Sequence, residues 1–286
     1  MLKVLFVVGL AYLLKRLRLF KEEDSKVLIS YVINFSLPFL AFRASHQLGL
    51  NREVLTLSIL AWMVIISCLL LSYTLAKWMK FEERTLRSFV LASSFGNTAF
   101  LGYPTAESLL GQKGLSYAVV YDSLGSFVLV STLGFLIASG RWDPMNLLRF
   151  PPFLGLVLGF LSSPFALPKF LADMVSFVAD STLVVVLFSI GLMLSFSQVR
   201  NNLKYTFLAL SIKMIFSSFV AILLGKLMGI QDIAYKVAVL ESAMPTMITA
   251  SVLAMMFDLN YHLAFASATL GIIFYFILIP LLVKVL

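Results

Sequence analysis

Four uncharged polar side chains interrupt two strongly hydrophobic stretches of this chain. Ser93, Asn97 and Thr98 lie in the sequence SSFGNTAFLGYPT, and Thr246 lies in the sequence ESAMPT. Amides and hydroxyls both donate and accept hydrogen bonds, so these groups could hold the carboxylate of a substrate. Alternatively, they satisfy backbone groups that an irregular helix leaves free. We favour substrate binding for Asn97 and leave both interpretations open for the three hydroxyls.

Both stretches also contain residues that weaken or break helices. Gly96, Gly102 and Pro104 occur in the first stretch and Pro245 in the second. Proline removes a backbone donor and costs roughly 3 kcal/mol inside a helix, so we expect the two prolines to create breaks. Paired interruptions in two halves of a chain are typical of the binding sites of secondary transporters. We therefore expect two broken helices that cross, although ordinary proline kinks are the alternative.

A broken helix would let this chain bind an anion although neither stretch contains an arginine. The N-terminus of a half-helix presents unpaired N–H groups and roughly half a positive charge. A carboxylate can bind at such an end without a dedicated basic side chain. The predicted ligand is therefore a small organic anion.

Four ionisable residues lie away from the ends of the hydrophobic stretches: Asp122, Asp180, Lys213 and Glu241. Each costs at least roughly 2.5 kcal/mol at the centre of a membrane helix. Lys213 could neutralise any of the three carboxylates, and for Asp180 we favour such a fixed ion pair. Asp122 or Glu241 could instead carry a coupling proton. A sodium site built from Glu241, Asn97, Ser93 and backbone carbonyls is a further possibility, because hard cations prefer oxygen ligands.

The composition predicts an all-α polytopic membrane protein. Of the 286 residues, 60% are hydrophobic and 13% are charged, more apolar surface than a soluble domain of this length can bury. Ten apolar segments are predicted to span the membrane. They are residues 1–17, 26–48, 55–79, 88–110, 117–139, 150–165, 170–196, 205–227, 233–256 and 262–286.

The distribution of basic residues predicts the orientation in a cell membrane. The loops after the first, third, fifth and seventh spans hold thirteen lysines and arginines, whereas the opposite loops hold seven, with Arg43 counted among them. The positive-inside rule then places both termini outside. With five spans in each half, the repeats at 1–143 and 144–286 would have opposite orientations in the membrane.

Several other functions find no support in the sequence. The single cysteine and two histidines form no multi-cysteine or HExxH metal site, and no GxSxG elbow occurs, so we expect neither an enzyme nor a bound cofactor. The net charge of +8 lies largely in loops and does not indicate nucleic acid. Gly155 and Gly159 have the GxxxG spacing, which could mark the seam of a homodimer.

The motif N-T-x-F-L-G-x-P at 97–104 resembles the signature of the auxin efflux carrier family. Tyr121-Asp-Ser, Ala243-Met-Pro, Ser251-Val-Leu-Ala and Leu37-Pro38 are also similar to that family. The resemblance implies two inverted five-helix repeats with broken fourth and ninth helices, as in bile-acid-symporter/NhaA-like folds. It implies a scaffold from spans one, two, six and seven, with a transport unit from the remaining spans. The short middle loop and the seventh span, which lacks proline, depart from the family.

The resemblance also implies transport of small organic anions such as auxin-like aromatic acids, malonate or malate. We expect a secondary transporter with alternating access, whose partners are this anion and the lipid bilayer, and whose coupling ion is a proton or sodium. A sodium-coupled symporter of the same fold is one alternative. A channel or a membrane receptor that binds without transport is another.

Overall fold

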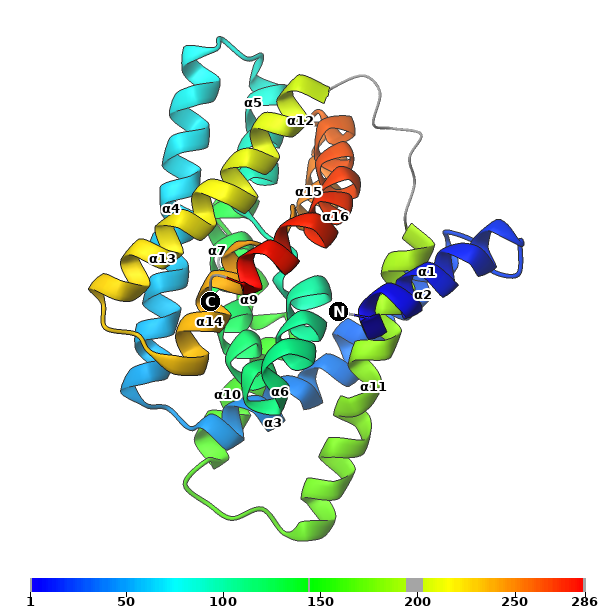
Figure 1. Cartoon of the computed structure of the whole chain (residues 1–286), viewed down its shortest axis with the longest axis vertical. Coiled ribbons are helices and arrows are strands. Elements are labelled where there is room, and N and C mark those ends of the chain that lie inside the picture. The colour runs from blue at the N-terminus through cyan, green and yellow to red at the C-terminus, as the bar shows by residue number, and fades with distance from the viewer. Residues whose placement is uncertain (1, 144, 194–202, 285–286) are drawn as a thin grey trace.

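The structure is a computed structural model that describes residues 2–143, 145–193 and 203–284. These residues form helices joined by short turns, with no strand among them (Figure 1). The α-helices are α1 (Leu2–Arg16), α2 (Asp24–Tyr31), α3 (Leu37–Leu48), α4 (Arg52–Trp78), α5 (Glu83–Ser94), α6 (Tyr103–Val120), α7 (Phe127–Leu129), α8 (Phe135–Ser139), α9 (Met145–Leu148), α10 (Pro151–Ser162), α11 (Lys169–Met193), α12 (Leu203–Leu210), α13 (Ser217–Leu227), α14 (Asp232–Ser242), α15 (Ile248–Met256) and α16 (Tyr261–Val283). Wider π-helical turns occur at Val32–Ser36, Thr98–Gly102, Tyr121–Ser126, Val130–Gly134 and Ser211–Phe216.

The helix lengths confirm a polytopic membrane protein. Six of the described helical segments are long and apolar enough to cross a membrane: Asp24–Leu48, Arg52–Trp78, Thr98–Ser139, Lys169–Met193, Leu203–Leu227 and Tyr261–Val283. Ten spans in two inverted halves stay a prediction. Residue 144 at the predicted repeat boundary, Arg200, and the ends of the predicted spans at 1, 194–196 and 285–286 lie outside the described residues.

The difference between six and ten has physical causes in the described helices. α1 and α10 have only 15 and 12 residues, shorter than the roughly 20 that a helix needs to cross the hydrocarbon core. The predicted spans 88–110 and 233–256 are each interrupted by non-helical residues. The segment Thr98–Ser139, by contrast, continues through Gly111 without ending, although φ is +70° there and the helical geometry is lost. The segment therefore changes direction at that glycine.

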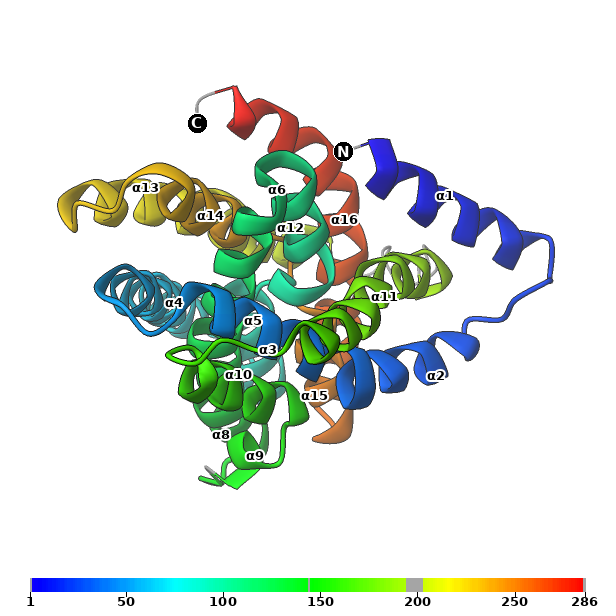
Figure 2. The same ribbon diagram turned by 90° about the horizontal axis from the view of Figure 1, so that it is seen from below.

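The helices pack in two groups that meet at α6. α10 packs on α3, and α11 packs on α1, α2 and α3. The second group includes α4, α5 and α12 to α16, in which α13 contacts α4 and α14, and α16 contacts α5, α12 and α15. Figure 2 shows α1, α2 and α11 on one side of the molecule and α13 and α14 on the other. α6 contacts both α3 and α14, so it joins the groups.

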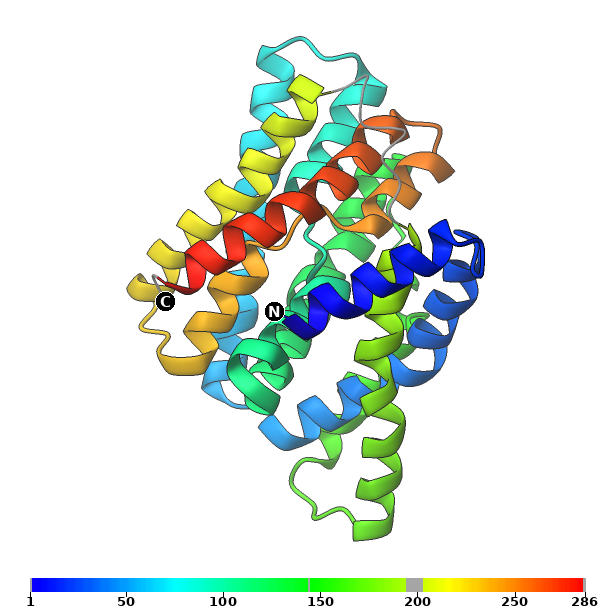
Figure 3. The ribbon, with the colours of Figure 1, turned by 45° about the vertical axis from the view of Figure 1, so that its right-hand side comes forward.

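The two interrupted helices meet at their interruptions. α5 ends at Ser94 and α14 ends at Ser242, and short irregular segments lead from them into the next helices. Gly96 and Thr246 form an antiparallel bridge between these two segments. Figure 3 shows α14 and α15 with the irregular segment between them, on the side of the molecule where α16 also runs. Residues from distant parts of the chain therefore share one buried junction.

The glycines at 155 and 159 pack against α3 of the same chain, and the homodimer stays a prediction. A Cβ on Gly155 would lie 2.2 Å from the carbonyl oxygen of Pro38, and one on Gly159 would lie 2.4 Å from that of Phe42. These small residues bring α10 and α3 into close backbone contact, as the GxxxG spacing does within membrane proteins generally. The surface offered for a homodimer is therefore already used by α3.

Gly159→Ala should destabilise the protein. Its Cβ would lie 2.0 Å from Ser45 Oγ, so α10 must move away from α3, at a cost of about 1–3 kcal/mol. The measurement is the thermal unfolding midpoint of the purified protein in detergent. Gly9→Ala is the matched control, because a Cβ on Gly9 meets nothing within 4 Å. Equal midpoints for both variants would contradict the tight α3–α10 packing.

Candidate functional site

The junction of the two interruptions is held by backbone hydrogen bonds. The Asn97 N–H donates to the Pro245 carbonyl at 2.7 Å, and the Met247 N–H donates to the Phe95 carbonyl at 2.9 Å. The Thr246 hydroxyl adds a bond of 2.8 Å to the Ala92 carbonyl. Backbone groups this deeply buried are costly when unpaired. Each interruption therefore satisfies polar groups that the other exposes.

The Asn97 side chain is buried in this junction without a hydrogen-bond partner. Asn97 is 1% exposed, and neither its Oδ1 nor its Nδ2 forms a hydrogen bond. Its own carbonyl accepts bonds from the N–H groups of Leu101 and Gly102. The predicted alternative, in which the side chain satisfies freed backbone groups, has no support among these contacts. A buried unpaired amide of this kind is a group whose missing partner requires an explanation.

Glu241 is the second buried polar side chain without a hydrogen bond. It is fully buried near the end of α14, and both carboxyl oxygens lack a hydrogen-bond partner. The carboxyl group lies against Gly102, where an added Cβ would be 2.0 Å from Glu241 Oε2. Gly102 therefore provides space for this carboxyl group, a role that the sequence did not indicate. An isolated buried carboxylate is very costly unless a proton or a cation neutralises it.

Asp122 has two hydroxyl partners and is already satisfied. The Thr98 hydroxyl donates to Asp122 Oδ1, and the Tyr103 hydroxyl donates to Oδ2 at 2.7 Å. All three residues are buried, and they lie within the segment Thr98–Ser139, with Thr98 and Tyr103 before the kink at Gly111 and Asp122 after it. The bonds fix the two parts of this segment against each other. The sequence analysis missed Tyr103, although it directly precedes Pro104 in the family motif.

Lys213 meets a backbone carbonyl rather than any of the three carboxylates named as possible partners. Its ammonium donates to the Ser242 carbonyl at 2.7 Å, and the Ser217 hydroxyl donates to the same oxygen at 2.5 Å. The Tyr121 and Ser242 hydroxyls are also hydrogen-bonded, at 2.9 Å. Ser217 and Tyr121 were missed as contributors, and no spacing in the sequence relates them to Ser242.

The remaining predicted residues lie at or outside the edges of this site. Ser93 donates to the Phe89 carbonyl one helical turn earlier, which is a local backbone bond. Pro104 lies downstream of the interruption at 95–97, where the wide helical turn Thr98–Gly102 passes into α6, and its role in creating the break stays a prediction. Pro245 does lie within its interruption, and its carbonyl accepts the bond from Asn97.

Asp180 lies apart from the junction, and its ion-pair partner is Arg43. The Arg43 Nη1 and Asp180 Oδ1 atoms are 2.7 Å apart, and the Asp180 side chain is 68% exposed. The sequence analysis counted Arg43 as a loop residue, whereas it is buried within α3. Its position inside the predicted span 26–48 was the signal that could have identified it. The fixed ion pair is therefore formed, but by a different base than Lys213.

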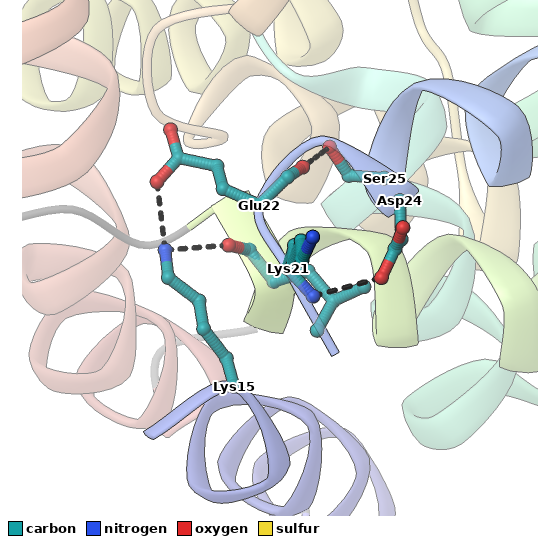
Figure 4. Close-up of polar contacts among 6 residues, drawn as sticks. Lys15, Lys21, Glu22, Asp24 and Ser25 are labelled. Atoms are coloured by element: carbon teal, nitrogen blue, oxygen red, sulfur yellow. Dashed lines mark hydrogen bonds and ion pairs between the residues drawn. The ribbon is translucent and has the colours of Figure 1, made fainter. Parts of the chain in front are cut away.

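Two cavities lie near the junction. The first, about 600 Å³, reaches from Glu22 and Lys26 to Phe100 and to Thr249 in α15. At its rim, the Lys15 ammonium bonds to Glu22 Oε2 at 2.8 Å and to the Leu192 carbonyl at 2.7 Å (Figure 4). These bonds tie the turn between α1 and α2 to the end of α11.

The second cavity, about 870 Å³, lies between α1, α6 and α11. Lys3, Glu107 and Leu183 contribute to its walls, and so does Pro104. The two cavities contact different parts of α11, because the first includes Met193 and the second includes Leu183. Ten residues separate these positions, which corresponds to about 15 Å along a helix.

Comparisons with known proteins bear on what such a site does. A family model described as membrane transport protein matches residues 1–143 and 140–283. An uncharacterized transporter of Methanocaldococcus jannaschii is 27% identical over 292 residues, which cover 97% of this chain and 95% of that protein. One of Methanothermobacter thermautotrophicus is 26% identical over 288 residues, covering 98% of this chain and 95% of that protein.

Tyr103→Phe should destabilise the junction through Asp122. The change removes one of the two hydroxyl donors to a buried carboxyl, which costs about 1.5–3 kcal/mol. Thermal unfolding in detergent measures the loss, and Tyr73→Phe is the control because Tyr73 is half exposed. In an Asp122→Asn background the effect of Tyr103→Phe should shrink. An undiminished effect there would show that Tyr103 stabilises the protein independently of Asp122.

Proposed function

We propose that this chain, which belongs to the membrane transport protein family, is a secondary transporter that moves a small organic anion by alternating access. The family match confirms the resemblance to auxin efflux carriers that the motif at 97–104 indicates. The family is one of transporters and not of enzymes. The observation that carries the proposal is the pair of buried, unpartnered side chains, Asn97 and Glu241, beside two interrupted helices that meet.

The anion would bind at helix ends beside Asn97. The helix that begins at Thr98 and α15, which begins at Ile248, both start at the junction, and neither has a side-chain cap. Their free N–H groups attract negative charge. The unpaired Nδ2 of Asn97 would donate to one carboxylate oxygen. This arrangement supplies binding without arginine, in the manner expected where broken helices cross.

Alternating access would proceed through the two cavities. In the predicted orientation, the first cavity adjoins the cytoplasmic turn after α1, and the second lies near the outer end of α1. Relative movement of the two helix groups would open one cavity to the junction and close the other. The group of α1, α2, α3, α10 and α11 corresponds to the predicted scaffold, which supports this assignment. The two family matches, which meet near residue 140, support a two-repeat architecture.

Glu241 is the group best suited to bind a coupling ion. Its carboxyl is buried without a partner, so a proton or sodium would relieve the cost of its charge. A monoanion that leaves a negative-inside cell gains about 2.3 kcal/mol per 100 mV, whereas its import is opposed by the same amount. Import therefore requires coupling. A sodium-coupled symporter of the same fold is the second candidate, because the same unpaired carboxyl would serve either ion.

Asn97→Ala should abolish binding and transport of the anion. Purified protein in proteoliposomes is adsorbed on a solid support and pulsed with malate, malonate and indole acetate. A saturable current for one of these acids is expected from the wild type, with none from the variant, because the amide donor is lost. Asn34→Ala, on an exposed helix face, should keep the wild-type current. Retained affinity in Asn97→Ala would move the site elsewhere, and a current that never saturates would indicate a channel.

Glu241→Gln should abolish pH-driven accumulation of the anion and leave passive exchange intact. The amide keeps the size of the side chain but cannot take up the coupling proton. Radiolabelled uptake is measured with and without an imposed pH gradient, and exchange is measured at equal pH. Glu82→Gln, at an exposed site between α4 and α5, is the control. Accumulation that survives in Glu241→Gln would exclude this residue as the coupling group.

A further inference from the structure

Lys213 places a buried positive charge at the junction. The proposed binding of the anion at the helix N-termini does not involve this charge. The side chain is 3% exposed, and its ammonium donates to the Ser242 carbonyl at 2.7 Å. It also lies against the other interruption, because a Cβ on Gly96 would be 2.6 Å from Lys213 Cε and 2.9 Å from Nζ. The ammonium is therefore held between the two irregular segments.

The position of this ammonium has the chemistry of a cation site. Ser242 is the last residue of α14, and the C-terminal end of a helix carries roughly half a negative charge. The Ser217 hydroxyl is bonded to the same carbonyl oxygen at 2.5 Å. Carbonyl, hydroxyl and carboxylate oxygens are the ligands that hard cations prefer.

Three other carbonyls of the two interruptions already accept hydrogen bonds. The Phe95 and Pro245 carbonyls accept the N–H groups that join the interruptions, and the Asn97 carbonyl accepts two further N–H groups. The Ser242 carbonyl has no backbone donor among the described hydrogen bonds, and it accepts instead from the Lys213 ammonium and the Ser217 hydroxyl. A sodium ion that used the Ser242 oxygen as a ligand would therefore have to compete with Lys213.

We propose that Lys213 is a tethered cation that fills this position permanently, excludes Na⁺ from it, and so makes the transporter independent of sodium. Because the ammonium is covalently attached, its effective concentration at the Ser242 carbonyl far exceeds that of a dissolved ion. Glu241 then remains available for a proton. The consequence for transport rests on the proposed function, whereas occupancy of the position is a property of the folded chain alone. Lys213 is thus a residue that determines ion specificity.

The test that does not depend on transport is thermal unfolding of the full chain in detergent. The wild-type midpoint should be the same in NaCl and in N-methylglucamine chloride of equal ionic strength. Lys213→Ala should unfold about 5 °C lower or more, because it leaves buried oxygens without their cation. Propylammonium, which matches the removed part of the side chain, should recover part of this loss. Lys226→Ala, at an exposed lysine of α13, should show neither the loss nor the recovery.

Two results would overturn the inference. One is a wild-type midpoint that rises specifically with Na⁺, and this comparison holds even if Lys213→Ala fails to fold. The other is a folded Lys213→Ala protein that does not respond to propylammonium.

A transport measurement separates this inference from the proposed function. Wild-type uptake of an acid that gives a current should be equal in the two salts. Uptake that requires Na⁺ would overturn the role of Lys213 and leave the transporter intact. Absence of uptake for every acid, together with propylammonium recovery in Lys213→Ala, would overturn the proposed function and leave the tethered cation intact.

Discussion

The structure depends on one constraint, which is that irregular backbone buried at membrane depth must find hydrogen-bond partners within the protein. α5 and α14 both end in the interior, where water cannot satisfy their last carbonyls and the N–H groups that follow. The two interruptions solve this together, through the Asn97 to Pro245 and Met247 to Phe95 bonds. Neither interruption is stable without the other. The positions of α15 and of the helix that begins at Thr98, whose N-terminal ends face the junction, follow from this pairing.

The buried charges at the junction differ in how they are satisfied. The Asp122 carboxyl has two hydroxyl donors, and the Lys213 ammonium has a carbonyl acceptor, so both have fixed partners. Glu241 has none. A bound proton or cation most readily neutralises a buried charge that has no other partner. The lack of partners therefore distinguishes Glu241 from the other two ionisable groups at the junction. The same reasoning underlies the proposal that Asn97 binds the substrate, because its backbone is hydrogen-bonded while its side chain is not.

The sequence predicted the junction better than it predicted the pairing of individual side chains. The interruption near Asn97 and the one at Pro245 were found because polar and helix-breaking residues are conspicuous in apolar segments. The partner of Asp180 was missed because Arg43, buried in α3, was assigned to a loop. Pro104 follows the interruption at 95–97 and lies within the helical run that begins at Thr98, where the wide turn Thr98–Gly102 passes into α6. Gly155 and Gly159 indicated close helix packing correctly, but not which helix they contact.

By itself, the sequence determined that this is a membrane protein, that it is helical, to which family it belongs, and the two places where helices break. These follow from composition and from local backbone preferences, which act over a few residues. Only the tertiary structure decided that the two interruptions bond to each other, that Glu241 lies against Gly102 without a partner, and that Lys213 meets the end of α14. Such contacts join residues 29 to about 150 positions apart. Short-range periodicity carries no information about them, because packing in three dimensions selects one pairing among several that the same residues allow.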